Sequence, residues 1–83
     1  MQSYIELTSL SAKRWLIRIE DIVLVEERTR FSEEELRHLP ELRRLSACCT
    51  LILRGVDETF WVKDTYMDIR RRLTHNPNDT KNR

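Results

Sequence analysis

Arginine is the residue type in this sequence best suited to chemistry, and it occurs in three clusters. Only Lys13, Lys63 and Lys81 are lysines among the fifteen Lys and Arg positions. A guanidinium presents its donors as a planar fork, so convergent arginines suit bidentate contacts to carboxylate or phosphate. The candidate ligand-binding residues are Arg28 and Arg30, Arg43 and Arg44, Arg70, Arg71 and Arg72, and the aromatic residues Trp61 and Tyr66. The first hypothesis is therefore a site for a small anionic, nucleotide-like ligand.

The same residues have a structural interpretation that the sequence leaves open. Glutamates surround the arginine clusters, so the charges can instead pair on solvated faces. An aromatic side chain on a half-buried strand is more often part of a core than a platform for a base. The alternative function is a protein–protein regulator or adaptor. Nucleic-acid binding ranks third, because a net charge of +1 gives little attraction to phosphate backbones.

Enzymatic and metal sites find little support in the sequence. Residues 33–35 are all Glu, but they fall in the exposed first turn of a predicted helix rather than in a pocket that separates their pKa values. A single glycine excludes the usual phosphate-cradling loops. Adjacent Cys48 and Cys49 point to opposite faces of a strand, so they suit neither a mutual disulfide nor one metal ion. We expect a non-catalytic protein with no cofactor and no metal.

Composition and length point to a small cytoplasmic protein of cellular or phage origin. No apolar run approaches the ~18 residues that a membrane span needs, and reduced cysteines suit a reducing compartment. Eighty-three residues predict a single domain over 1–74, followed by a disordered tail over 75–83 that has nothing to bury. A core this small leaves stability marginal unless subunits associate, so we expect a homo-oligomer.

The hydrophobic pattern predicts an α+β fold. Alternating or β-branched runs at 4–8, 15–19, 22–25, 49–54 and 59–63 are typical of strands, and Gly55 lies where a hairpin turn needs a positive φ. The continuous apolar run at 22–25 suits a central strand. Asp64 or Thr65 caps a final helix through Leu73. We expect one five-stranded antiparallel sheet, or a partly open barrel, with a C-terminal helix.

Residues 28–47 form a helical insertion between the third and fourth predicted strands. Ser32 and Glu35 have the spacing of a capping box, and Pro40 ends or kinks the helix that begins at Ser32. Leucines then recur at threes, as Leu36, Leu39, Leu42 and Leu45. This stripe either folds back onto the sheet or meets the same stripe of a second subunit. Insertions into surface turns often carry the specialised function of a scaffold.

Several segments together resemble one known family. They are Tyr4–Leu10, Ile22, Val25–Glu27, Thr50–Leu53 with Gly55, and Val62–Tyr66 with Ile69. Their order resembles the FlbD-like small flagellar and swarming motility proteins. The resemblance implies short strands followed by one helix, and a regulator that acts by binding other proteins. That family joins its third and fourth strands by a short turn, where this chain has its helical insertion.

Overall fold

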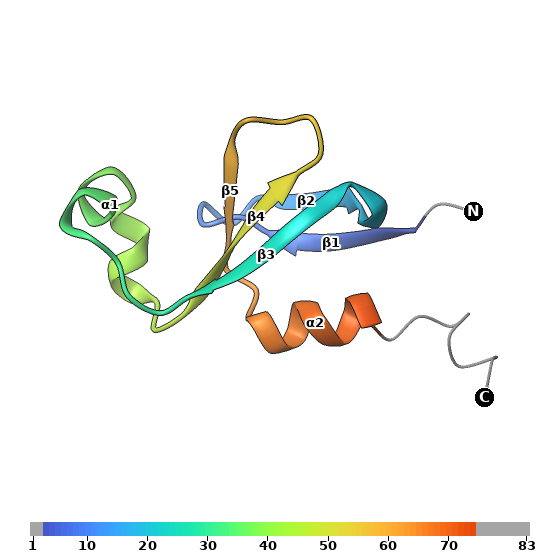
Figure 1. The fold of residues 1–83 in the computed structure, drawn as a ribbon. Helices are drawn as coiled ribbons and strands as arrows, with labels where there is room; N and C mark the ends of the chain where they lie inside the picture. Colours follow the sequence, from blue (N-terminus) through green and yellow to red (C-terminus); the bar gives the residue numbers. More distant parts are fainter. Residues whose placement is uncertain (1–2, 75–83) are drawn as a thin grey trace.

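The computed structural model describes residues 3–74, so the predicted tail at 75–83 lies outside the described residues. The α+β composition agrees with the sequence prediction (Figure 1). The elements in chain order are β1 (Tyr4–Thr8), β2 (Arg14–Arg18), the 3₁₀ turn η1 (Ile19–Asp21), β3 (Ile22–Arg28), α1 (Glu33–His38), the 3₁₀ helix η2 (Pro40–Arg44), β4 (Cys48–Leu53), β5 (Thr59–Val62) and α2 (Tyr66–Thr74).

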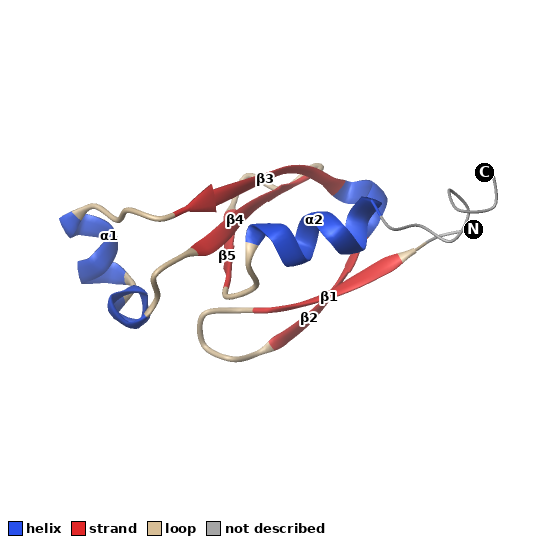
Figure 2. Ribbon diagram, turned by 90° about the horizontal axis from the view of Figure 1, so that it is seen from below, coloured by secondary structure: helices blue, strands red, loops and turns tan. Residues whose placement is uncertain are grey.

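The strands form two antiparallel sheets, β1-β2 and β3-β4-β5, so the prediction of one five-stranded sheet or barrel is wrong. The turn η1 separates them. The Asp21 carboxylate accepts a hydrogen bond from Nε of Arg18 at 2.9 Å, and the Asp21 carbonyl accepts one from the Arg54 N–H at 2.7 Å. These bonds fix a change of chain direction, so β2 and β3 belong to different sheets. Helix α2 lies beneath both sheets in Figure 1 and across the seam between them in Figure 2.

The central strand is also not the one that the sequence predicts. The apolar run 22–25 lies in β3, at an edge, and its Val23 and Leu24 are 61% and 47% exposed. Strand β4 is central instead, and its first four residues, Cys48–Leu51, are all buried. Both faces of β4 are covered because the main core packs on one side and the insertion packs on the other.

Two hydrophobic clusters hold the chain together. The main core lies between the sheets and α2, and its buried residues are Ile5, Leu7, Ile17, Cys49, Leu51, Val62 and Ile69. The second cluster joins the insertion to the sheet. Its buried residues are Leu10, Leu42 and Cys48, and the other three leucines of the insertion pack against them. The leucine stripe therefore folds back onto its own chain, which decides between the two alternatives that the sequence left open.

One carboxylate connects the two sheets to α2. Oδ1 of Asp64 accepts a hydrogen bond from the Thr8 N–H at 2.7 Å, and Oδ2 accepts one from Nη2 of Arg72 at 3.1 Å. Nη1 of Arg72 also donates to the Glu6 carbonyl at 2.8 Å. The Lys63 N–H donates to the Thr8 carbonyl at 2.7 Å. We call this arrangement of Thr8, Lys63, Asp64 and Arg72 the Asp64 joint.

Replacing Asp64 with Ala should lower the free energy of unfolding by about 1–3 kcal/mol, because the part-buried Thr8 N–H loses its acceptor. The melting temperature should fall by about 4–8 °C for each kcal/mol lost in a domain of this size. Thermal unfolding followed by circular dichroism measures the change. Asp68→Ala is the matched control, since Asp68 contacts Arg72 at 2.9 Å but has a side chain that is 43% exposed, against 14% for Asp64. An equal loss in both variants would contradict the role of Asp64.

Candidate functional site

The insertion begins and bends as its sequence predicts. Oγ of Ser32 accepts the Glu35 N–H at 3.1 Å, and the Glu35 carboxylate accepts the Ser32 N–H at 3.0 Å, which confirms the capping box. Leu39 leaves helical geometry with φ −129° and ψ 74°, and Pro40 then begins η2. This bend places η2 opposite the turn that joins β1 to β2.

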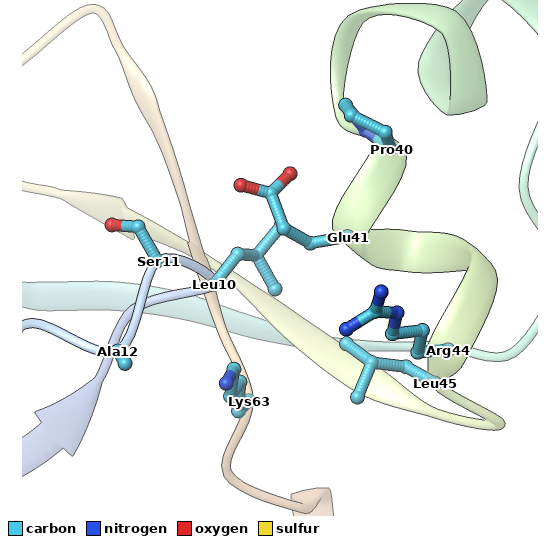
Figure 3. Close-up of a pocket in the computed structure, with 8 residues that line it drawn as sticks. All are labelled: Leu10, Ser11, Ala12, Pro40, Glu41, Arg44, Leu45 and Lys63. Atoms are coloured by element: carbon cyan, nitrogen blue, oxygen red, sulfur yellow. The ribbon is translucent and has the colours of Figure 1, made fainter.

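A groove of about 520 Å³ lies between η2 and that turn (Figure 3). The turn is held by Ser9, whose Oγ accepts the Lys13 N–H at 3.0 Å, and it passes through Ala12 at φ 71°. We call this hollow the η2 groove. Its lining residues are Leu10, Ser11 and Ala12 of the turn, Pro40, Glu41, Arg44 and Leu45 of the insertion, and Lys63 after β5.

The η2 groove carries more positive than negative charge. Arg44 and Lys63 are both exposed, and neither takes part in the ion pairs found within residues 3–74. In the view of Figure 3 both cations lie below Leu10, whereas the Glu41 carboxylate lies above it. Because both cations line one hollow, a bound anion there would be attracted by both charges.

An aromatic hollow of about 320 Å³ adjoins the η2 groove and shares Leu10, Ser11 and Glu41 with it. Its remaining wall includes Trp15, Phe60 and Trp61. Trp15 and Phe60 pack edge to face, with ring centroids 5.6 Å apart and planes at 88°. Aromatic surface of this kind suits a planar group of a ligand.

A third hollow, of about 510 Å³, contains Arg28 and Trp61, two of the residues that the sequence singled out. The Arg28 guanidinium lies 4.9 Å from the Trp61 ring centroid, and its Nη2 donates to both carboxylate oxygens of Glu35 at 2.9 Å. Hydrogen bonds from the Ser32 N–H and then from Arg28 lower the pKa of Glu35. Arg28 is thus paired within the chain, and it anchors the insertion to β5.

The three arginine clusters do not converge, which corrects the arrangement that the sequence suggested. The C-terminal end of α2, with Arg70, Arg71 and Arg72, lies at the opposite end of the molecule from the insertion (Figure 1). Arg72 belongs to the Asp64 joint, and Arg71 lies 3.9 Å from Asp68. The physical reason is that carboxylates within the fold recruit these guanidinium groups.

The remaining predicted site residues have separate environments. Arg43 lies beside Arg44 on η2 but does not line the η2 groove. Arg30 is exposed just after β3. Tyr66 packs against the main core, as the structural interpretation expected. Sequence reasoning missed Lys63, whose only signal is its position as a basic residue directly after β5.

Both cysteines are free and buried, which confirms their interpretation as packing residues. Burial raises the pKa of the Cys49 thiol to about 11 and also raises that of Cys48. Residues 3–74 contain no group of three or more His, Cys, Asp or Glu side chains placed to hold a metal ion. In the same residues, no helix has the length and apolar character to cross a membrane.

The ion pair between Glu35 and Arg28 should make the stability of the fold depend on pH in the acidic range. Because the folded-state pKa of Glu35 is lowered, its stabilising contribution is complete above the ordinary value of 4.5 and is lost as pH falls through the lowered pKa. Glu35→Gln keeps a capping acceptor but removes the charge next to Arg28. The variant should show a shallower loss of stability at acidic pH, measured by Trp61 fluorescence in a Trp15→Phe background. If stability falls equally steeply with decreasing pH in both proteins, the Glu35 carboxylate does not contribute to stability in this way.

Comparison of this chain with protein-family models, curated proteins and solved structures finds no match in any of the three.

Proposed function

We propose that this chain is a non-catalytic binding protein that captures a small anionic ligand in the η2 groove. The observation that supports the proposal most directly is the position of Arg44 and Lys63 on one hollow of about 520 Å³ without ion-pair partners among residues 3–74. This volume lies in the range of about 300–1,000 Å³ that small-molecule sites occupy. The Arg44 guanidinium supplies a bidentate donor, and Lys63 supplies a compact charge.

The surroundings of the two cations favour a nucleotide-like ligand. A phosphate held by Arg44 and Lys63 leaves the rest of the ligand next to Leu10 and the adjoining aromatic hollow. A planar base there contacts apolar and aromatic surface, and the Glu41 carboxylate accepts a hydrogen bond from an amino or hydroxyl group. One site thus offers a contact to each chemical part of a nucleotide.

The binding function fits a cytoplasmic setting, because two free buried cysteines suit a reducing compartment. A second candidate function is that of a protein–protein regulator, as the resemblance to the motility family implies. The exposed apolar edge of β3 favours that candidate, since free sheet edges bind extended chains.

Calorimetric titration of the full chain with inorganic phosphate and with cyclic and linear nucleotides tests the proposal. We expect measurable affinity for at least one of these anions. Arg44→Ala and Lys63→Ala should each weaken that affinity by roughly tenfold or more, since a charged hydrogen bond contributes about 1.5–3 kcal/mol. Both side chains are exposed, so the melting temperature should stay nearly unchanged.

Arg43→Ala is the matched control, because Arg43 carries the same charge on the same helix but does not line the groove. Arg70→Ala, on α2, controls for loss of charge elsewhere. Equal weakening in all four variants would indicate a general charge effect and contradict a defined site. No heat with any anion, together with specific capture of a protein partner, would reject anion capture in favour of the regulator.

A further inference from the structure

The aromatic hollow beside the η2 groove is lined by two carboxylates as well as by its aromatic rings. Glu41 lines both hollows, whereas Glu58 lines the aromatic hollow but not the η2 groove. Both side chains are exposed, and neither takes part in an ion pair found within residues 3–74. A planar group that enters the aromatic hollow therefore meets carboxylate oxygens beside the rings.

The turn between β4 and β5 positions Glu58. The chain reverses there through Gly55, whose φ is 77°, and β5 begins at Thr59, directly after Glu58. The same strand contributes Phe60 and Trp61 to the wall of the hollow. One short segment thus supplies both a carboxylate and two of the aromatic rings.

The two hollows can hold different parts of one nucleotide. In the proposed function the phosphate lies with Arg44 and Lys63 in the η2 groove, and the base lies in the aromatic hollow. Glu41 belongs to both hollows, and in Figure 3 its carboxylate lies on the opposite side of Leu10 from the two cations. That position suits the sugar between phosphate and base. Glu58 is then the carboxylate that remains for the base.

A carboxylate accepts hydrogen bonds and donates none, so it distinguishes the bases by the donors that they present. Guanine presents two donors side by side, its N1–H and its 2-amino group, which match the two oxygens of one carboxylate. Adenine and cytosine each present an amino donor beside a ring nitrogen that only accepts. Uracil presents one N–H between two carbonyl oxygens. An acceptor placed against a carboxylate oxygen is disfavoured, so the carboxylate selects guanine.

The other polar side chains of the aromatic hollow suit every base equally. Ser9, Ser11 and Thr59 carry hydroxyl groups, which can donate or accept. The indole N–H groups of Trp15 and Trp61 only donate, and every base carries an acceptor that can meet a donor. The carboxylate is therefore the group in the hollow that discriminates between bases.

We propose that the anionic ligand of this chain is a guanine nucleotide, and that Glu58 selects the base by accepting from guanine N1–H and the 2-amino group. This inference rests on the proposed function, because it requires the phosphate to lie in the η2 groove. It adds the identity of the base and the residue that selects it.

Calorimetric titration of the full chain with guanosine, inosine and adenosine monophosphates tests the proposal. The guanine nucleotide should bind at least about tenfold more tightly than the adenine nucleotide. Inosine monophosphate keeps the N1–H but lacks the 2-amino group, so its affinity should lie between the two. Glu58→Gln replaces one carboxylate oxygen with an amide donor, so the preference for guanine should be lost or reversed. Its affinity for inorganic phosphate should not change.

Asp57→Asn is the matched control, because Asp57 is an exposed carboxylate in the same turn but does not line the aromatic hollow. This variant should keep the preference for guanine, and thermal melts verify that both variants fold. Equal wild-type affinity for the guanine and adenine nucleotides would overturn this inference and leave anion capture intact. Equal loss of the preference in both variants would overturn the role of Glu58. Failure of every nucleotide to bind would overturn the inference together with the proposed function.

Discussion

The hydrogen-bonded carboxylate of Asp64 determines how the two sheets are placed relative to each other. It accepts a hydrogen bond from the N–H of Thr8, a residue 56 positions earlier in the chain. It also accepts one from the guanidinium of Arg72, which lies on α2. Apolar packing is non-directional, so the main core alone does not fix the angle between hairpin and sheet. Thr65 follows at once, and its Oγ1 accepts the Asp68 N–H at 3.2 Å to cap α2. The position of Lys63 on the η2 groove therefore follows from the geometry of its neighbour.

The insertion is integrated into the fold rather than appended to it. Leu42 and Cys48 are fully buried between the insertion and β4, and Arg28 ties Glu35 to Trp61. A long insertion adds little closure entropy, and burial of the apolar side chains of Leu42 and Cys48 opposes that cost. The same segment then supplies one wall of the groove. The buried side chain of Leu42 holds η2, the element that carries Arg44, against the sheet.

Local features were predictable from sequence, and long-range partners were not. The capping box of Ser32, the bend at Pro40 and the positive φ of Gly55, at 77°, each depend on a few neighbouring residues. The break at Glu20-Asp21 is visible in the sequence, but its consequence depends on Arg54, more than thirty residues later. The partners of the arginines are likewise set by tertiary structure, since Arg28 pairs with Glu35 and Arg72 pairs with Asp64. Lys63 and the β1–β2 turn meet the insertion only in three dimensions.

The adjacent cysteines carry a consequence for how the domain unfolds. Cys49 faces the main core and Cys48 faces the second cluster, so consecutive residues of one strand are buried on opposite sides. If β4 separates from one cluster, the strand that also contributes a buried side chain to the other cluster is displaced. The two clusters thus share strand β4. Unfolding of the insertion is for this reason coupled to unfolding of the sheet. We therefore expect residues 3–74 to unfold as one cooperative unit, in which the insertion loses its order together with the sheet.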